Sequence, residues 1–533
     1  MPKSRANWTF AVVVGLYMLY AAGFIYKTST VINGTRYFTL FDDAMISMRY
    51  AKNIAAGAGP VWNVGGDHVE GFTNPLWTAY MAFWHLFNIP APDISLAIQI
   101  SGAALMVGTL FVVRRIVRHL SKSEWTAIGA VVLTAFSLHL NTWSLQGTEV
   151  SILALIISLS VWYTLVALTT HQFSILPYVI LGIGTLVRID VVVPLIALIV
   201  FGFFNDRSYR WRHVIVGLMV LAAFMIPQTA FRLWYYGDWL PNTYYLKMTG
   251  YPVLYRVLNG LHYAATYLGH VGILVVLVFF FRRDKGIRLL AWMFVVQMLY
   301  SIYVGADAWD AWSYGANRYV SIALPMLFIL VAIGFRELLA VAAIGFRHLQ
   351  GIQPSKPARI VASLVLVGMA FFSMNALYGP DAIGEVVLLN SNLNVGDNAN
   401  MIRRALIVDS LTTPAARIAV VWAGITPYFS NRPSVDLLGK SDRQIAHMTA
   451  RNQIAENNPY LELGLYYPGH MKWDYTYSIG KLRPDVVVDL WKVPWEADPY
   501  LKNDYVDVHI SDFEFWLLKD SPNILWDQVK PSS

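Results

Sequence analysis

Residues 94–122 have the sequence ISLAIQISGAALMVGTLFVVRRIVRHLSK, in which a long run without charges is followed by a cluster of basic residues. A run of about 17–25 apolar residues is long enough to cross the hydrocarbon core of a bilayer as one helix. Lys and Arg gather in the loops on the cytoplasmic side of such helices. The stretch therefore predicts a transmembrane helix that ends in the cytoplasm.

The same pattern recurs along the chain and predicts a polytopic α-helical membrane protein. Of the 533 residues, 56% are hydrophobic and 14% are charged, whereas a soluble domain carries about a quarter charged residues. About eleven transmembrane helices are predicted, at residues 8–26, 94–113, 125–142, 149–169, 173–187, 191–204, 214–233, 266–281, 289–304, 319–338 and 358–376. The basic clusters that would be cytoplasmic lie at residues 3–5, 114–122, 207–212, 282–288 and 336–359.

Two apolar segments need a separate interpretation. Residues 8–26 follow a basic N-terminus as in a signal peptide, but the run has the length of a span and lacks a cleavage pattern of small residues. We therefore expect a retained first helix. Residues 75–89 are short, and a span there would place the basic cluster at 114–122 outside the cell. We expect this segment to lie on the outer surface or to re-enter from it.

The chain divides into a transmembrane domain and a soluble domain. Beyond residue 376 the apolar runs stop, and segments rich in β-branched residues at 417–422 and 485–490 predict strands. We expect a transmembrane domain at 1–376, with an outer loop at 27–93, and a soluble C-terminal α/β domain at 377–533.

Composition excludes several kinds of site. The chain has no cysteine, which excludes disulfides, thiol catalysis and Cys-ligated zinc. Its net charge of +7 would suit a nucleic-acid partner, but the basic residues stand in short clusters between apolar runs. We therefore expect membrane lipids, and no nucleic acid, as partners.

Unusual polar residues gather in the loops predicted to lie outside. Asp42 and Asp43 begin a helix, where one carboxylate can cap free backbone N–H groups and the other remains available for a ligand. Arg49 lies two turns from Asp42 and can pair with it instead. Asn74 precedes a proline and suits a helix cap, whereas Glu70 is not needed for one.

Ionisable residues also flank or interrupt the apolar runs. Glu149 begins a predicted span, and Arg188 and Asp190 interrupt the apolar stretch from 173 to 204. Charges at membrane depth cost a few kcal/mol or more, so they pair with each other, as Arg188 and Asp190 can, or face a polar cavity. Further polar residues of the outer loops are Arg232, Asn242, Lys247, Asp307, Asp310, Asn317 and Arg318. Interfacial snorkelling is an alternative explanation for Arg232 and Lys247.

The convergence of five outer loops predicts one site above the membrane. Arg and Lys bind phosphate, a carboxylate accepts the proton of a hydroxyl, and aromatic rings stack on sugars. Such a set suits an anionic lipid headgroup beside a neutral polar molecule. Clustered carboxylates also suit a divalent cation such as Ca²⁺ or Mg²⁺, although no complete ligand set for a metal or other cofactor is evident.

Several strings resemble those of one enzyme family. They are FDDAMISMRYAKNIAAGAGPVWNVGGDHVEGFTNPLW at 41–77, QGTE at 146–149, LVRID at 186–190, YYGDWLPNTYYLK at 235–247, the loop at 305–318 and AGITPYFSNRPSVDLLGKSD at 423–442. Together they resemble the AftB-like membrane arabinofuranosyltransferases of the GT-C glycosyltransferase superfamily, over residues 38 to 447. The chain departs from the family at Ile189 and Ala306, where the family commonly has Pro and Gly.

The resemblance implies a substrate, a location and a set of roles. The donor would be polyprenyl-phospho-arabinofuranose, and the reaction would take place on the periplasmic face of the bacterial inner membrane. The acceptor would be a cell-surface glycan or glycoprotein, which the C-terminal domain binds or orients. Asp43 or Asp42 maps onto the family's catalytic carboxylate. We expect the donor phosphate to contact Arg188, Lys247, Arg318 and Arg232, and the substrates to contact Arg49, Glu70, Asn74, Glu149, Asp190, Asn242 and Asp307.

Other functions remain as alternatives. A polyprenyl-lipid ligase would use a large outer loop with Arg and His, and a flippase would line a central cavity with cations. A secondary transporter would carry charges near the bilayer midplane and show an inverted repeat. Here the charges favour the outer ends of the predicted spans, and we find no repeat. A receptor-like protein would bind its ligand in the C-terminal domain and would not need Asp42 or Asp43.

Overall fold

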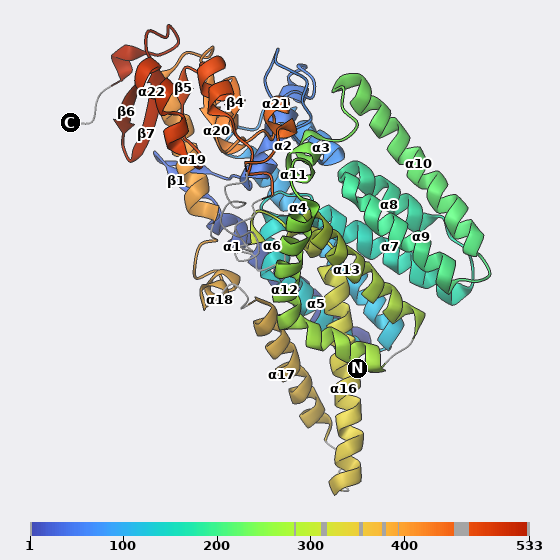
Figure 1. The fold of residues 1–533 in the computed structure, drawn as a ribbon. Helices are drawn as coiled ribbons and strands as arrows, with labels where there is room; N and C mark the ends of the chain where they lie inside the picture. The colour runs from blue at the N-terminus through green and yellow to red at the C-terminus, as the bar shows by residue number, and fades with distance from the viewer. Residues whose placement is uncertain are drawn as a thin grey trace.

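The structure is a computed structural model that describes residues 3–281, 284–310, 317–350, 355–375, 380–392, 394–451 and 468–529. Residues 282–283 and 351–354 of two predicted basic clusters, and 311–316 of the loop at 305–318, lie outside the described residues. A helical bundle forms the larger part of the molecule, and a C-terminal α/β domain covers one of its ends (Figure 1). We call this the capped end; it also carries α2 (Asp42–Ala55) and α3 (Pro75–His85).

The apolar runs form the helices of the bundle. Among the described residues, six helices are long and apolar enough to cross a membrane (α1, α4, α7, α10, α13 and α16), or seven if one bent pair counts as a span. The remaining predicted spans fall on α8, on α9, on α17 and within α12, so the polytopic helical architecture is confirmed. The bounds are α1 (Lys3–Lys27), α4 (Ile94–Ser121), α5 (Glu124–Ala135), α6 (Leu138–Leu145), α7 (Val150–Thr170), α8 (Leu176–Val187), η1 (Ile189–Val191), α9 (Val192–Asn205), α10 (Arg210–Tyr235), α11 (Asn242–Met248), α12 (Val253–Phe281), α13 (Lys285–Val304), α15 (Arg318–Ser321), α16 (Leu324–Gln350) and α17 (Lys356–Asn375).

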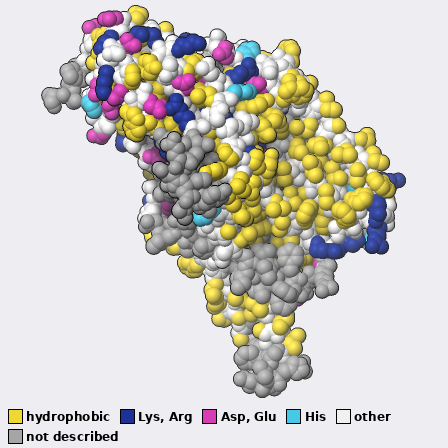
Figure 2. All heavy atoms as spheres, in the orientation of Figure 1, with side chains coloured by type: hydrophobic (Ala, Val, Ile, Leu, Met, Phe, Trp, Pro, Cys, Tyr) yellow, Lys and Arg dark blue, Asp and Glu magenta, His cyan; other side chains and the backbone are white. Residues whose placement is uncertain are grey.

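The surface of the bundle has the polarity of a membrane protein. Figure 2 shows a broad apolar face over the side of the bundle, with Lys and Arg gathered at its lower edge and mixed charges on the C-terminal domain. On α10, Leu218, Met219 and Ile226 are exposed apolar residues. Arg207 and Arg212, at the connection from α9 to α10, are exposed at the end of α10 away from the capped end. Apolar side chains can contact the hydrocarbon of the lipid without an energetic cost, which explains why this face is apolar.

One predicted span is broken into two helices. α5 ends at Ala135 and α6 begins at Leu138, with a bend of 54° between them. The side chain of Asn375 supports the break, because its Oδ1 accepts from the Leu138 N–H at 2.8 Å and its Nδ2 donates to the Phe136 carbonyl at 3.1 Å. Backbone groups freed inside an apolar region need such partners. The span predicted at 125–142 is therefore a bent pair of helices and not one straight helix.

The first outer loop folds against the bundle. It begins with the hairpin β1 (Thr30–Ile32) and β2 (Thr35–Tyr37) and continues into α2 and α3. α3 packs against α2, α4 and α8 at the capped end and does not cross the bundle (Figure 1). The short apolar segment predicted to lie at the outer surface therefore forms a helix that packs against α2.

The C-terminal domain is built on a five-stranded mixed sheet of order β4-β3-β5-β7-β6. β3 pairs in parallel with β4 and β5, and β7 pairs antiparallel with β5 and β6. The strands predicted at 417–422 and 485–490 are β3 and β5, and both are confirmed. The bounds are α18 (Pro380–Val386), α19 (Asn394–Leu411), β3 (Ile418–Val420), α20 (Ile425–Ser430), β4 (Ser434–Asp436), α21 (Arg443–His447), η3 (Thr476–Lys481), β5 (Val486–Val487), η4 (Pro494–Glu496), α22 (Asp498–Asp504), β6 (Tyr505–Ile510), β7 (Phe513–Leu518) and η5 (Trp526–Gln528).

The first outer loop and the C-terminal domain share a hydrophobic core. Tyr50, Trp62 and Phe72 of the loop pack in one cluster with Val408 and Ile418 of the domain. The two parts also approach closely, because a Cβ built on Gly424 would lie 1.9 Å from the carbonyl oxygen of Asp42. The loop at 27–93 therefore packs against both the bundle and the domain predicted at 377–533.

Candidate active site

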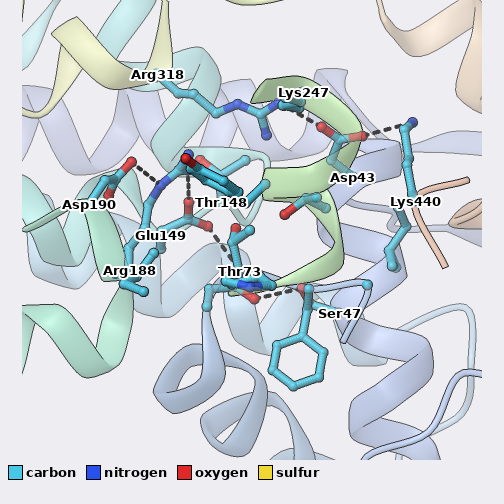
Figure 3. Close-up of a pocket in the computed structure, with 18 of the residues that line it drawn as sticks. Asp43, Ser47, Thr73, Thr148, Glu149, Arg188, Asp190, Lys247, Arg318 and Lys440 are labelled. Atoms are coloured by element: carbon cyan, nitrogen blue, oxygen red, sulfur yellow. Dashed lines mark hydrogen bonds and ion pairs between the residues drawn. The ribbon is translucent and has the colours of Figure 1, made fainter. Parts of the chain in front are cut away.

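A pocket opens at the capped end, between the bundle and the C-terminal domain. Its walls come from α2, the turn before α3, the start of α7, the junction of α8 with η1, α11, α13 and α15, and the C-terminal domain adds two side chains. The charged side chains on its wall are Asp43, Glu149, Arg188, Asp190, Lys247, Arg318 and Lys440 (Figure 3). Six of these seven belong to the predicted site, so residues far apart in the sequence meet in one cavity.

Asp43, the second residue of α2, presents its carboxylate to the pocket between two cations. Its Oδ2 accepts from Arg318 Nη2 at 2.7 Å, and its Oδ1 accepts from Lys440 Nζ at 3.2 Å (Figure 3). Burial alone would raise the pKa of Asp43, but Lys440, Arg318 and Lys247 outweigh burial and hold this pKa well below its ordinary value. Asp43 is therefore an ionised, oriented carboxylate, and each oxygen keeps a second lone pair for a ligand.

Arg318 is fixed by the loop that precedes it. Its Nε donates to Asp307 Oδ2 at 2.6 Å, behind the pocket wall. Asp310 Oδ2 in turn accepts from the Asp307 N–H at 2.6 Å and from Asn317 Nδ2 at 2.9 Å. The charged loop predicted at 305–318 thus supports Arg318, and Asp307 itself does not line the pocket.

Arg188 lies where α8 ends, between two carboxylates. Its Nε donates to Asp190 Oδ2 at 2.7 Å, and its Nη1 pairs with Glu149. Burial would lower the pKa of Arg188, yet Asp190 and Glu149 outweigh it and raise the pKa well above its ordinary value. The pairing of Arg188 with Asp190 that the sequence allowed is present, and the group still faces the pocket.

Asn74 links this group to α2 instead of capping α3. Its Nδ2 donates to Glu149 Oε2 at 2.9 Å, and its Oδ1 accepts from Ser47 at 2.8 Å and from Thr78 at 3.0 Å. No side-chain hydrogen bond caps the start of α3. Asn74 thus stands at the N-cap position ahead of Pro75, as predicted, but its side chain makes no cap bond to the backbone because its amide is bonded to the side chains of Ser47, Thr78 and Glu149.

Lys247, on α11, is the uncommitted cation of the pocket. Among the described residues its ammonium forms no ion pair or hydrogen bond, although it contributes to the low pKa of Asp43. Its aliphatic stem passes Gly469, where a built Cβ would lie 3.1 Å from Lys247 Cε. A half-buried ammonium without its own counterion is well placed to receive an anionic ligand.

Two residues of the C-terminal domain were missed by the sequence analysis. Lys440 contacts Asp43, and His470 lines the pocket with its ring 6.2 Å from Trp422 and 6.5 Å from Trp309. Burial and then Lys440 lower the pKa of His470 to about 3, so its imidazole is neutral. The available signal for Lys440 was its place in the string at 423–442, where it is the single lysine.

Two predicted residues of α2 lie outside the pocket. Asp42 is buried, and its Oδ1 accepts from the Ile425 N–H at 2.7 Å in the C-terminal domain. Arg49 extends into that domain and donates to the carbonyl oxygens of Trp62 at 2.7 Å and Arg432 at 2.8 Å. The ion pair between Asp42 and Arg49 that the sequence allowed is therefore not formed, and neither side chain is placed to contact a ligand in the pocket.

Glu70, Arg232 and Asn242 form a support beside the pocket. Arg232 pairs with Glu70 through two contacts, and their side chains are 2% and 6% exposed. Asn242 Nδ2 donates to the carbonyl oxygens of Gly439 at 2.9 Å and Lys440 at 3.1 Å. Arg232 is committed to Glu70, so the structure does not place it to bind a donor phosphate, and Asn242 holds a protein loop.

The pocket carboxylates are matched to cations. Asp43 faces Arg318 and Lys440, while Glu149 and Asp190 face Arg188. Within the described residues, the group with metal-ligand spacing is Asp507, His509 and Glu514. All three are exposed on the β6–β7 hairpin at the far edge of the C-terminal domain (Figure 1). The donor set of the pocket therefore suits an anion better than a divalent cation.

Two segments of the chain match family models. Residues 78–231 match the dolichyl-phosphate-mannose-protein mannosyltransferase family, and residues 393–519 match a domain of unknown function, DUF8728. The first match covers most of α3 to α10, and the second covers most of the C-terminal domain. No curated protein sequence matches the chain.

The whole chain is similar to solved membrane-protein structures. ArnT from Cupriavidus metallidurans, bound to undecaprenyl phosphate, matches with a TM-score of 0.55 and 13% identity over 99% of both chains. The Archaeoglobus fulgidus oligosaccharyltransferase, tethered to an acceptor peptide, matches with a TM-score of 0.56 and 12% identity over 99% of this chain and 75% of that chain. These likenesses show the fold, which is the GT-C architecture expected from the sequence.

Proposed function

We propose that this protein is a membrane glycosyltransferase that moves a sugar from a polyprenyl-phosphate donor to an acceptor hydroxyl. The observation that carries the proposal is the single pocket in which the carboxylate of Asp43 meets Arg188, Lys247, Arg318 and Lys440. The family match to mannosyltransferases and the fold likeness to a protein that binds undecaprenyl phosphate support it. The catalytic carboxylate is Asp43 rather than Asp42, because only Asp43 lines the pocket.

The donor lies with its phosphate in the pocket and its chain in the membrane. Lys247 receives the phosphate because its ammonium has no ion pair or hydrogen bond within the described part of the chain, and Arg188 and Arg318 flank it. An apolar groove between α3, α4, α7 and α8 begins beside this group, since Val187 and Ile152 line it next to Arg188 and Glu149. Such a groove suits the isoprenoid chain of a lipid donor.

Transfer forms one bond and breaks one bond. The acceptor oxygen bonds to the anomeric carbon while the carbon–oxygen bond to phosphate breaks, and the phosphate keeps the electron pair. Lys247, Arg188 and Arg318 stabilise this growing charge more in the transition state than before it. A bound phosphate also draws cations away from Asp43, which raises the pKa of that carboxylate and lets it take the proton of the acceptor hydroxyl.

The acceptor enters from the side of the C-terminal domain. Trp422 and Trp309 lie 6.0 Å apart, and the ring of His470 packs against both beside Lys440. Aromatic faces and a neutral imidazole suit the apolar face and hydroxyls of a sugar. We propose a cell-surface glycan or glycoprotein as acceptor, on the periplasmic face of the bacterial inner membrane.

We propose D-arabinofuranose as the transferred sugar. The support is the resemblance to arabinofuranosyltransferases in the strings at 41–77 and 235–247. Both strings supply pocket residues, including Asp43 and Lys247. Asp307 and Glu149 hold the cations of the pocket in place.

The experiment combines purified protein in proteoliposomes with polyprenyl-phospho-arabinofuranose and octyl glycosides as acceptors, with products identified by mass. We expect the wild-type protein to form the arabinosylated product. Asp43→Asn should slow transfer by about 10²-fold or more, because it removes the proton acceptor.

Asp42→Asn is the matched control, because it makes the same chemical change one residue away and outside the pocket. It should transfer at close to the wild-type rate. Transfer by Asp43→Asn at the wild-type rate would reject the assignment of the carboxylate. Consumption of a polyprenyl-phosphate hexose in place of the pentose would reject the sugar and leave the reaction class standing.

A further inference from the structure

We propose that Lys440 is a positioning residue, inserted by the C-terminal domain into the active site to fix the orientation and charge of Asp43. The inference rests on the proposed function, in which Asp43 handles the proton of the acceptor. Lys440 is 5% exposed, and its Nζ lies 3.2 Å from Asp43 Oδ1 and 5.7 Å from the centre of the Trp422 ring. Long side chains lose rotamer entropy when buried, so this placement needs a rigid support.

The loop that carries Lys440 is wrapped around a buried carboxylate. Asp436, at the end of β4, accepts from the N–H groups of Leu438 at 3.0 Å, Gly439 at 3.1 Å and Ser441 at 2.6 Å. Backbone N–H groups on both sides of Lys440 are therefore fixed to a single side chain that is 1% exposed. The loop presents Lys440 in one conformation.

The transmembrane half holds the same loop from the other side. Asn242 Nδ2 donates to the carbonyl oxygens of Gly439, Lys440 and Asp442 at 2.9, 3.1 and 3.2 Å. Gly71 provides the seat, because a Cβ there would lie 2.3 Å from Ser441 Oγ and 3.0 Å from the Lys440 carbonyl oxygen. Asn242 and Gly71, both in the outer loops, thus receive the Lys440 loop.

The position of Lys440 determines the electrostatics of Asp43. The charged and titratable groups around Asp43 are Asp42 on α2, Lys247 on α11, Arg318 on α15, Asp307 behind Arg318, and Lys440 and His470 from the C-terminal domain. Figure 3 shows Arg318 and Lys440 on opposite sides of the carboxylate. With Lys440 removed, one oxygen loses its ion pair, so the carboxylate turns more freely and binds a proton more readily.

The first test is the pH dependence of kcat for sugar transfer in proteoliposomes. Lys440→Met should lower kcat about 10-fold or more, because Asp43 is no longer held in one orientation. It should also move the acid limb of the profile to higher pH, because a cation that favours ionised Asp43 is lost. Lys440→Arg should restore most of both. Lys472→Met is the matched control, since Lys472 is a buried lysine of the same domain that donates to the carbonyl oxygens of Tyr245 and Ala446.

An acid limb that is unchanged in Lys440→Met, or that moves equally in Lys472→Met, would overturn the positioning role. A second test does not depend on activity and compares the thermal midpoints of Asp43→Asn, Lys440→Met and the double variant in detergent. The double variant should lose less than the sum of the single losses. Additive losses would overturn the pairing, whereas coupled losses in a protein that transfers no sugar would support the pairing and reject the proposed function.

Discussion

At the scale of single residues, Asp42 and Asp43 have identical side chains in adjacent positions and opposite surroundings. Successive residues of a helix point about 100° apart. Asp43 faces Arg318 and Lys440 in the pocket, while Asp42 faces the backbone of Ile425. The local sequence predicted a pair of carboxylates at the start of a helix. Their different surroundings depend on partners that lie 275 to 397 positions away in the chain.

The buried carboxyl of Asp42 should make stability depend on pH. Burial raises its pKa from 3.8 to about 6, so the folded protein binds this proton more tightly than the unfolded chain does. The resulting stabilisation is complete below about pH 4 and is lost as the pH rises through about 6. Asp42→Asn should therefore stabilise the folded protein at pH 8 by at most about 3 kcal/mol, and so raise the thermal midpoint there. At pH 4 it should change the midpoint little.

Differential scanning fluorimetry in detergent from pH 4 to pH 8 measures this difference. Asp43→Asn provides the comparison, because the pKa of Asp43 is lowered in the folded protein and its contribution has the opposite sign. A gain for Asp42→Asn that stayed constant across the pH range would contradict an ionisation effect.

At the scale of elements, the break between α5 and α6 shows what apolar periodicity does not detect. Hydropathy alone favours one helix over 125–142, because no charge or proline marks the bend. The partner that makes the bend possible is Asn375, which lies 237 positions beyond Leu138. Side-chain hydrogen bonds across that distance have no signature in the local pattern.

Removal of the Asn375 side chain should destabilise this bend. Asn375→Leu keeps the volume but leaves the Leu138 N–H and the Phe136 carbonyl without their partner. Each buried unpaired group costs about 1–3 kcal/mol, so we expect a loss of about 2 kcal/mol or more, seen as a lower thermal midpoint. Phe372→Leu, at an exposed position of the same helix, is the control and should change the midpoint little.

The predicted helices and strands follow from patterns that are local in the sequence. Apolar length predicted the helices of the bundle, and β-branched runs predicted β3 and β5. These local patterns did not predict which cations face the pocket. Arg232 and Lys247 stand in one aromatic segment, yet Glu70 occupies Arg232 while Lys247 remains open to the pocket. Residue type alone predicted both as phosphate ligands, and the fold selects between them.

At the scale of the whole molecule, the proposed active site depends on docking of the C-terminal domain, which supplies Lys440 and His470 to the pocket. Arg49 supports this docking with four hydrogen bonds, two of them to the carbonyl oxygens of Pro427 and Arg432. Its other acceptors are the carbonyl oxygen of Trp62 and the side chain of Asn63. Arg49 thus joins the first loop to the domain that carries Lys440.

Arg49→Met should loosen the two halves and reduce catalysis together. Hydrogen bonds from a charged donor contribute about 1.5–3 kcal/mol each, so we expect a loss of about 3 kcal/mol or more and faster limited proteolysis of the C-terminal domain. Sugar transfer should fall with it, because Lys440 is no longer held at Asp43. Arg36→Met is the control, since Arg36 donates to Ser29 within the same loop. A stable but inactive Arg49→Met protein would contradict this account.

The core shared by the first loop and the C-terminal domain also determines when this part of the protein can fold during biosynthesis. The indole of Trp62 donates to the carbonyl oxygen of Ala423, which the ribosome adds 361 residues later. At about 5–20 residues per second, roughly 20–70 s separate the two. During that interval the loop has already been synthesised while its apolar partners do not yet exist. A truncated chain, however many of its helices have been inserted, would therefore carry an open and unfinished catalytic surface.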